Sequence, residues 1–412
     1  MASKLSKATN TARKGLIVFF IFAISTFLFR FIFGLTEDPT NNIRPTAVPR
    51  SPYLQTNEAL GNIPYPDKIS LSSQPGETAT YSIQDQAVLP EFPPVVNVYR
   101  INKPREKLGN SSKGIQVAGK FELNSIGRVI ADNQTLWQNP ETSRSLEYDK
   151  LYELWDYEID LTKEQLDAET AAKMRLSTNT EFYNDKGTSI MSMLTLMDSF
   201  FNRAKSRIDY INMDTQTRNI SLVDTPRNAT FVRIKQSRTI LSAETDPDYR
   251  PAQGEIAYQS QSSEIRNAKY NDGIANIIVR GSLENIVPDI VDFKYRQFNY
   301  GEKGIYPALT STEAFLRIQA GEGILYWIKL QDADPYSNHQ LLSVLEYIIE
   351  APKTELVYVE PEVWDESIPQ SWTHFLQPYY LFEGVALLTD GREADFAYLV
   401  PALKQSEYIL NN

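Results

Sequence analysis

The stretch "THFLQPYYLFEGVALLTDGREADFAYLVPAL", Thr373 to Leu403, carries the clearest fold signal in the chain. Two runs inside it, "YYLFEGVALLTD" and "ADFAYLVPAL", are continuously apolar or alternate between apolar and polar residues, which is typical of β-strands. Between them stands Asp390-Gly391, a dipeptide that favours a tight turn. The pattern predicts a hairpin of two long strands near the end of the chain.

The same stretch has to be considered as an active site, because it holds His374, one of two histidines, beside the acid Glu383. A histidine-activated serine usually sits on a strained turn such as G-x-S-x-G, and neither His374 nor His339 lies near one. Glu383 precedes Gly384, a pair that suggests a bulge or a close approach of two backbones. We therefore predict a packed strand here and assign no catalytic residue.

Two short acidic loops are candidate metal sites: "QDADPYSN", with Asp332 and Asp334, and "ETDPDYR", with Asp246 and Asp248. Calcium loops combine several oxygen ligands with a tight glycine turn. Each candidate loop contains a proline and lacks the glycine, so ordinary polar turns are predicted. The chain has no cysteine and two histidines, which excludes disulfides, cysteine-ligated zinc and a three-histidine metal site. No metal-binding or cofactor-binding residue is predicted.

The N-terminus has the pattern of a membrane anchor. Residues 1–14 carry four basic residues and no acid, and they precede the apolar run "GLIVFFIFAISTFLFRFIFGL", Gly15 to Leu35. A helix of that length spans about 31 Å, which matches the hydrocarbon core of a bilayer. The basic residues place the N-terminus in the cytoplasm. No A-x-A-like cleavage site follows, so we predict a retained transmembrane helix and an extracytoplasmic C-terminal part.

The charge of the remaining chain narrows the choice of partners. Residues 1–35 contain five Lys and Arg and no acid, so the rest holds 36 basic against 52 acidic residues, a net charge of −16. Phosphates repel such a protein, which argues against nucleic acid as a partner.

Composition divides the chain into further segments. Residues 36–94 contain ten prolines, which predicts an extended spacer, although a short docked strand around "ETATYSIQDQAVL" is equally compatible. A first module, residues 95–180, starts with the strand-like "VVNVYRI", continues with aromatic-rich strands and ends with a helix at "TKEQLDAETAAKMRL". A second region, residues 181–412, opens with an amphipathic helix over Ser189–Ser206 and continues with many short strands. The predicted fold class is α+β, with antiparallel sheets each covered by one or two helices.

One helix of the second region has clear boundaries. In "YPALTSTEAFLRIQAGEG", Thr310 and Glu313 have the spacing of a capping box, and Gly321 and Gly323 end the apolar stripe. Together with the closing hairpin, this helix predicts a helix-on-hairpin module over about residues 306–403.

The anchor, the capped helix and "FLQPYYLFEGVAL…DFAYLVPAL" together resemble the YycH/YycI-type regulators and, more broadly, other one-pass bacterial membrane proteins. The corresponding pattern positions are Tyr306, Thr312, Glu313, Ala314, Gly321, Leu376, Pro378, Tyr380, Phe382, Glu383, Gly384 and Pro401. The resemblance implies PepSY-like ectodomain modules on a membrane anchor, and contact with a sensor histidine kinase. The long proline-rich segment departs from that family.

Two functions are therefore considered. The first is a single-pass, membrane-anchored interaction or regulatory protein without catalytic activity, whose partner is another membrane or envelope protein such as a sensor kinase; a structural component of an envelope assembly would look the same. The alternative is a cell-envelope carbohydrate or peptidoglycan hydrolase, which would need two carboxylates facing each other about 5–10 Å apart.

Overall fold

The structure is a computed structural model of the whole chain. It describes residues 53–66, 79–106, 110–163, 176–194, 206–214, 216–248, 259–280, 290–296, 298–331, 333–334, 342–364, 366–367 and 371–409. The chain divides into two compact units, Met1–Arg50 and Ser51–Asn412, and all described residues belong to the second. The predicted anchor, residues 15–35, lies outside them. Within the described part, no helix has both the length and the apolar composition to cross a membrane.

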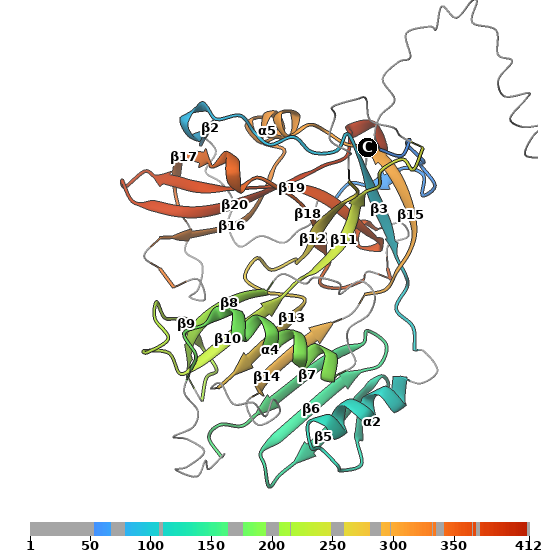
Figure 1. Cartoon of the computed structure of the whole chain (residues 1–412), viewed down its shortest axis with the longest axis vertical. Helices are drawn as coiled ribbons and strands as arrows, with labels where there is room; N and C mark the ends of the chain where they lie inside the picture. The colour runs from blue at the N-terminus through green and yellow to red at the C-terminus, as the bar shows by residue number, and fades with distance from the viewer. Residues whose placement is uncertain are drawn as a thin grey trace, which may run out of the picture. The chain divides into compact units, whose positions relative to one another are not determined.

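The described residues are mostly β, with 47% strand, 16% helix and three α-helices. They form two large sheets, of nine and ten strands, together with one small two-stranded sheet (Figure 1). The predicted α+β class, built from separate helix-on-hairpin modules, is therefore wrong. That prediction treated strands that are neighbours in the sequence as self-contained units. Much of the strand pairing instead joins segments that are far apart in the chain.

The first sheet, which we call the nine-stranded sheet, has antiparallel pairing throughout. Its strands, in spatial order, are β4 (Arg128–Ala131), β5 (Gln134–Asn139), β6 (Arg144–Asp149), β7 (Leu154–Ile159), β14 (Ile290–Arg296), β13 (Ala275–Val279), β10 (Phe231–Gln236), β8 (Ser206–Met213) and β9 (Ile220–Leu222). The aromatic-rich strands predicted from the sequence appear as β4 to β7. Because β7 pairs with β14, strands from residues 95–180 and 181–412 share this sheet.

Two helices, α2 (Asn110–Lys120) and α4 (Thr180–Met193), lie across one face of this sheet (Figure 1). Their apolar residues pack into one core with alternate residues of the strands, including Trp155 and Tyr157 of β7. The helix predicted over Ser189–Ser206 begins earlier than expected, because the side chain of Asn179 caps α4 at its N-terminus. Residues 195–205 lie outside the described residues, as do residues 164–175, which make up most of the helix predicted at 162–176.

The opposite face of the nine-stranded sheet carries charged residues beside one small apolar cluster, formed by Ile211, Met213, Phe231, Ile278 and Val291. Side chains alternate between the two faces of a strand, so Asp156, Asp209, Lys235 and Lys294 point away from the core that contains Trp155. They form cross-strand ion pairs, with 2.7 Å between Lys235 Nζ and Asp209 Oδ2 and 3.2 Å between Lys294 Nζ and Asp156 Oδ2. These charged residues of the second face are thus paired with one another across neighbouring strands.

The second sheet, which we call the ten-stranded sheet, is organised around its longest strand, β19 (Phe375–Leu388). The other members are β2 (Thr80–Ile83), β3 (Val95–Ile101), β11 (Arg238–Ala243), β12 (Gln261–Asn267), β15 (Tyr300–Pro307), β16 (Ile324–Leu330), β17 (Val344–Ile349), β18 (Glu355–Glu360) and β20 (Glu393–Pro401). In the small sheet, β1 (Ile63–Pro64) pairs with β21 (Tyr408–Ile409). Elsewhere among the described residues, short 3₁₀ turns lie at Gln84–Gln86, Ala351–Lys353, Trp372–His374 and Gln405–Glu407. The segment predicted as an extended spacer, residues 36–94, is described in part. Its described residues include β1 and β2, and β2 pairs with β17.

Several local predictions are confirmed in this sheet. The hairpin of β19 and β20 turns at Asp390-Gly391, where Gly391 has a φ of +83°. The helix α5 (Ser311–Gln319) carries the complete capping box of Thr310 and Glu313. The Glu383-Gly384 pair marks a close backbone approach and no bulge, because the pairing of β19 with β20 continues through it, while a Cβ atom on Gly384 would overlap the carbonyl of Ile348 on β17.

Candidate functional site: a polar groove between the two sheets

Three adjoining hollows lie over the charged residues on the face of the nine-stranded sheet opposite α2 and α4, where the ten-stranded sheet faces it, and we call them together the polar groove. The large hollow, of about 290 Å³, is lined by Arg207, Asp209, Leu222, Lys235, Arg266, Tyr270, Asn271, Trp327 and Glu383. A neck of about 10 Å³ shares Arg207, Lys235 and Arg266 with it. The small hollow, of about 200 Å³, shares Asn267, Asp272 and Gly273 with the neck and extends to β7 and β14. The groove therefore runs across five strands.

The floor of the large hollow follows from the pairing of β8 with β10. Arg207 and Lys235 stand directly opposite each other on these strands, an arrangement of like charges that would be unfavourable alone. Asp209 bonds to Lys235, and Glu264 of β12 accepts a hydrogen bond of 3.0 Å from Arg207. Burial lowers the pKa of Lys235, and the neighbouring Asp209 carboxylate opposes that shift.

The wall from the ten-stranded sheet continues this ionic network. Arg266 lies 3.1 Å from Glu264 through Nε and donates to Glu355 over 3.1 Å through Nη2. Burial alone would lower the pKa of Arg266, but the carboxylates, with Glu264 and Glu383 contributing most, raise it. Cations and anions thus alternate along the wall and hold one another in place.

An aromatic pair completes the large hollow. Tyr270 and Trp327 stack with 4.6 Å between ring centroids and 16° between ring planes. A bulge in the pairing of β16 with β20, between Leu325 and Trp327, allows the consecutive residues Tyr326 and Trp327 to pack on the same side. The Tyr270 hydroxyl donates to Glu383 Oε1 over 2.7 Å, and burial together with this carboxylate raises the pKa of Tyr270.

The loop between β12 and β13 forms the neck. At Gly273 a Cβ atom would lie 2.7 Å from the carbonyl oxygens of Ala275 and Gln236, so only glycine fits there. Arg233 of β10 holds the adjacent Asp272 with 2.6 Å between Nη2 and Oδ1. The narrowing of the groove is therefore part of the packed structure.

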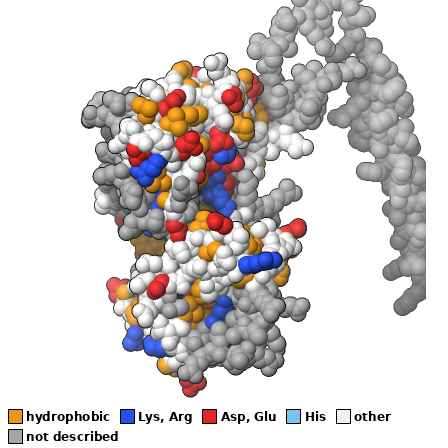
Figure 2. All heavy atoms as spheres, turned by 90° about the vertical axis from the view of Figure 1, so that its left-hand side faces the viewer, with side chains coloured by type: hydrophobic (Ala, Val, Ile, Leu, Met, Phe, Trp, Pro, Cys, Tyr) orange, Lys and Arg blue, Asp and Glu red, His pale blue; other side chains and the backbone are white. Residues whose placement is uncertain are grey.

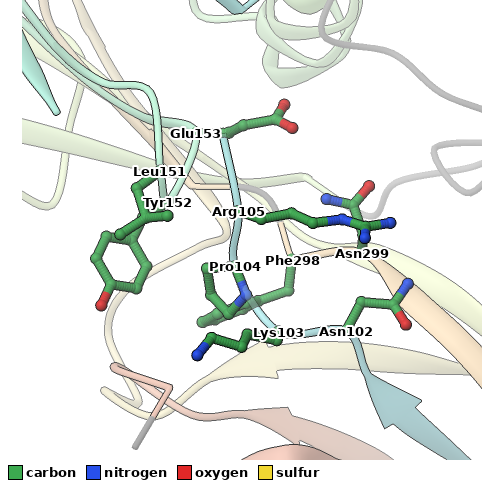
Figure 3. Close-up of a pocket in the computed structure, with 9 residues that line it drawn as sticks. All are labelled: Asn102, Lys103, Pro104, Arg105, Leu151, Tyr152, Glu153, Phe298 and Asn299. Carbon is green, nitrogen blue, oxygen red and sulfur yellow. The ribbon is translucent and has the colours of Figure 1, made fainter. Parts of the chain in front are cut away.

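A second, smaller pocket of about 140 Å³ lies where the chain leaves β3 (Figure 3). It is lined by Asn102, Lys103, Pro104, Arg105, Leu151, Tyr152, Glu153, Phe298 and Asn299. Figure 3 shows the side chains of Lys103 and Arg105 extending in different directions, and Glu153 is engaged by Lys113 over 2.8 Å. Because its charged groups do not converge, this pocket is a weaker candidate than the polar groove.

The outer edge of the nine-stranded sheet offers a different kind of surface. Among the described strands, β4 pairs only with β5, so its other edge is open. Three apolar side chains are exposed on or beside β4: Ile126 by 97%, Val129 by 70% and Ile130 by 42%. A bulge between Val129 and Ala131 interrupts the pairing with β5 at Ile130.

Comparison with known proteins finds no matching family model, no matching curated protein and no matching solved structure. The resemblance to the YycH/YycI-type regulators therefore stays a prediction. The site must be interpreted from its own geometry.

The residues considered in the sequence fall in several places. His374 lies in a 3₁₀ turn and stacks on Trp364 with 4.2 Å between centroids, and Glu383 lines the large hollow. Asp246 accepts the amide of Asp248, an ordinary polar turn, while Asp334 accepts the amide of Leu222 over 2.9 Å. His339 and Asp332 lie outside the described residues. Within the described part of the chain, no group of three or more His, Cys, Asp or Glu is arranged to hold a metal ion.

Sequence reasoning did not find the groove. A signal was present, because "SRIDYINM" and "FVRIKQ" alternate charged and apolar residues, which indicates strands with one polar face. What faces those charges is supplied by β12, β16 and β19, and no local pattern identifies these strands as neighbours.

Proposed function

We propose that this protein is a single-pass, membrane-anchored extracytoplasmic interaction protein that regulates or supports another envelope protein by docking. The observation that carries the proposal is the exposed apolar edge at β4. Exposed apolar patches of more than a few hundred Å² are uncommon on soluble domains and mark interaction surfaces, and the three exposed side chains lie between positions 126 and 130. An open strand edge adds unpaired backbone groups, which can bind an extended segment of a partner as an extra strand.

The chemistry of β4 suggests what the partner presents. Val129 and Ile130 favour β-branched or other apolar side chains in an extended segment, since these pack well across strands. Arg128 is exposed beside them and favours an acidic residue in the same segment. The partner is thus an envelope protein with an accessible, largely apolar strand that carries an acid.

The location rests on the N-terminal sequence. The apolar run of residues 15–35 and the basic residues before it support an anchor with the folded part outside the cytoplasm. Removal of residues 1–35 should move the protein from the membrane fraction to the soluble fraction. Recovery of the shortened protein in the membrane fraction would contradict the anchor.

A photo-reactive residue at Val129 of the full-length protein in membranes tests the docking edge. We expect one major cross-linked partner from Val129 and none from the same residue at Leu345, which is 57% exposed on the ten-stranded sheet. Ile126→Asp should abolish the cross-link, because a charge would have to be buried at the contact. Equal cross-linking from both positions, or purification in mild detergent without any stable partner, would contradict the proposal.

The alternative of a carboxylate-dependent hydrolase has weaker support. Asp209 and Glu383 line the same large hollow, as a pair of catalytic acids would. Each already has a partner, however, because Asp209 bonds to Lys235 and Glu383 accepts from Tyr270. Because both carboxylates are already paired, the groove is better suited to binding a ligand than to hydrolysing one.

A further inference from the structure

We infer that the large hollow of the polar groove is a binding site for a neutral saccharide, with one sugar ring packed against the Tyr270–Trp327 pair. This inference does not depend on the docking edge at β4, because the groove and the edge are built from different strands. A ligand in the groove would contact both sheets.

The charge of the groove favours a neutral ligand. Around the large hollow and the neck, the cations Arg207, Lys235 and Arg266 are matched by the carboxylates Asp209, Glu264 and Glu383. A ligand with a single sign of charge would therefore meet repulsion as well as attraction. Over one whole face of the molecule, acidic and basic side chains are interspersed (Figure 2). Hydroxyl groups both donate and accept hydrogen bonds, so they can bond to either kind of side chain.

The aromatic pair favours a ring with an apolar face. Tyr270 and Trp327 add flat, amphipathic rings to an otherwise ionic hollow. Sugar rings carry C–H groups on their faces and hydroxyls around their rim. The faces can therefore pack against the aromatic side chains while the hydroxyls bond to the neighbouring charged groups. Ligand sites commonly combine such an apolar wall with a few convergent polar groups.

The dimensions fit one sugar ring in the large hollow. The large hollow of about 290 Å³ is close to the lower limit of ligand pockets, which is about 300 Å³. The neck of about 10 Å³ has room for about one water molecule, so a ligand in the large hollow does not continue into the small one. A peptide is less favoured, because the groove passes over side chains and offers no strand edge for a backbone ladder.

Calorimetric titration of the full-length protein in detergent tests the inference. The probes are a tetramer of N-acetylglucosamine, a tetramer of glucose, the two monomers, and an extended peptide of mixed charge. We expect at least one neutral tetramer to bind, through one of its rings in the large hollow. Trp327→Ala should weaken tetramer binding by about tenfold, equivalent to about 1.4 kcal/mol.

Matched variants separate binding from folding. Trp327→Phe keeps an aromatic ring and should restore most of the affinity, while Tyr152→Ala, in the pocket beside β3, should leave affinity unchanged. Thermal unfolding of each variant shows whether the fold is retained. The inference is overturned if no neutral tetramer binds, if Trp327→Ala binds as tightly as Trp327→Phe, or if the peptide binds more tightly than every saccharide. None of these results would affect cross-linking from Val129, so the two proposals can fail separately.

Discussion

Arg238 and Glu360 form an ion pair that is entirely enclosed in the protein, with 3.0 Å between Nη2 and Oε1 and 0% of either side chain exposed. Arg238 begins β11 and is separated from the end of β10 by Ser237 alone, so the pair lies where the chain passes from the nine-stranded into the ten-stranded sheet. The Tyr300 hydroxyl also donates to Glu360 Oε1, over 2.6 Å. Charges in such surroundings are tolerated only with several partners.

Replacement of one member of this pair should be strongly destabilising. For Arg238→Met we expect a loss of about 3–5 kcal/mol in the free energy of unfolding, because Glu360 would stay buried without its cation. Denaturant titration measures the change. The double variant Arg238→Met/Glu360→Leu should recover part of the loss. A single variant that loses less than about 1 kcal/mol would contradict this account of the junction.

Gly384 should not tolerate a side chain. In Gly384→Ala the new methyl group would overlap the carbonyl of Ile348, so β17 and β19 would have to separate, and we expect a loss of at least about 3 kcal/mol. Gly119→Ala is the matched control, because Gly119 lies in α2 with no atom within 4 Å of the added group. There we expect a gain of about 0.5–1 kcal/mol from helix propensity. Similar stabilities for the two variants would disprove the close approach.

The cap of α5 should respond to acid. The backbone amide of Thr310 donates to the Glu313 carboxylate over 2.7 Å and lowers the pKa of Glu313. The contribution to stability is therefore complete above the ordinary glutamate pKa of about 4.3 and is lost as the pH falls through the lower folded value. The difference in unfolding free energy between the natural protein and Glu313→Gln should shrink as the pH falls from about 5 to about 3. Thr312→Ala, at an exposed neighbour, should show no such trend.

The parts of the fold that depend on short-range interactions were predictable. The β19–β20 hairpin follows from two apolar runs and an Asp-Gly turn, and α5 follows from an apolar stripe with a capping box. In both, the residues that determine the structure lie within a few positions of each other. The close approach at Gly384 was also suggested by the sequence, although its partner Ile348 was not.

The site was less predictable. The polar faces of β8 and β10 have a sequence signal, but Trp327 reaches the groove only through a bulge, and Glu383 was interpreted as part of a packed strand. A bulge depends on the register between two strands, which the sequence of one strand does not specify.

The sequence by itself determined where many of the strands and one capped helix form, because hydrophobic periodicity and turn chemistry act locally. It also predicted an N-terminal anchor, which the described residues leave untested. The tertiary structure alone decided that β7 pairs with β14 and that β12 and β16 face β8 and β10. The physical reason is that sheet pairing is chosen by the burial of whole faces over long separations in the chain, so two sheets arise where local patterns suggest separate modules.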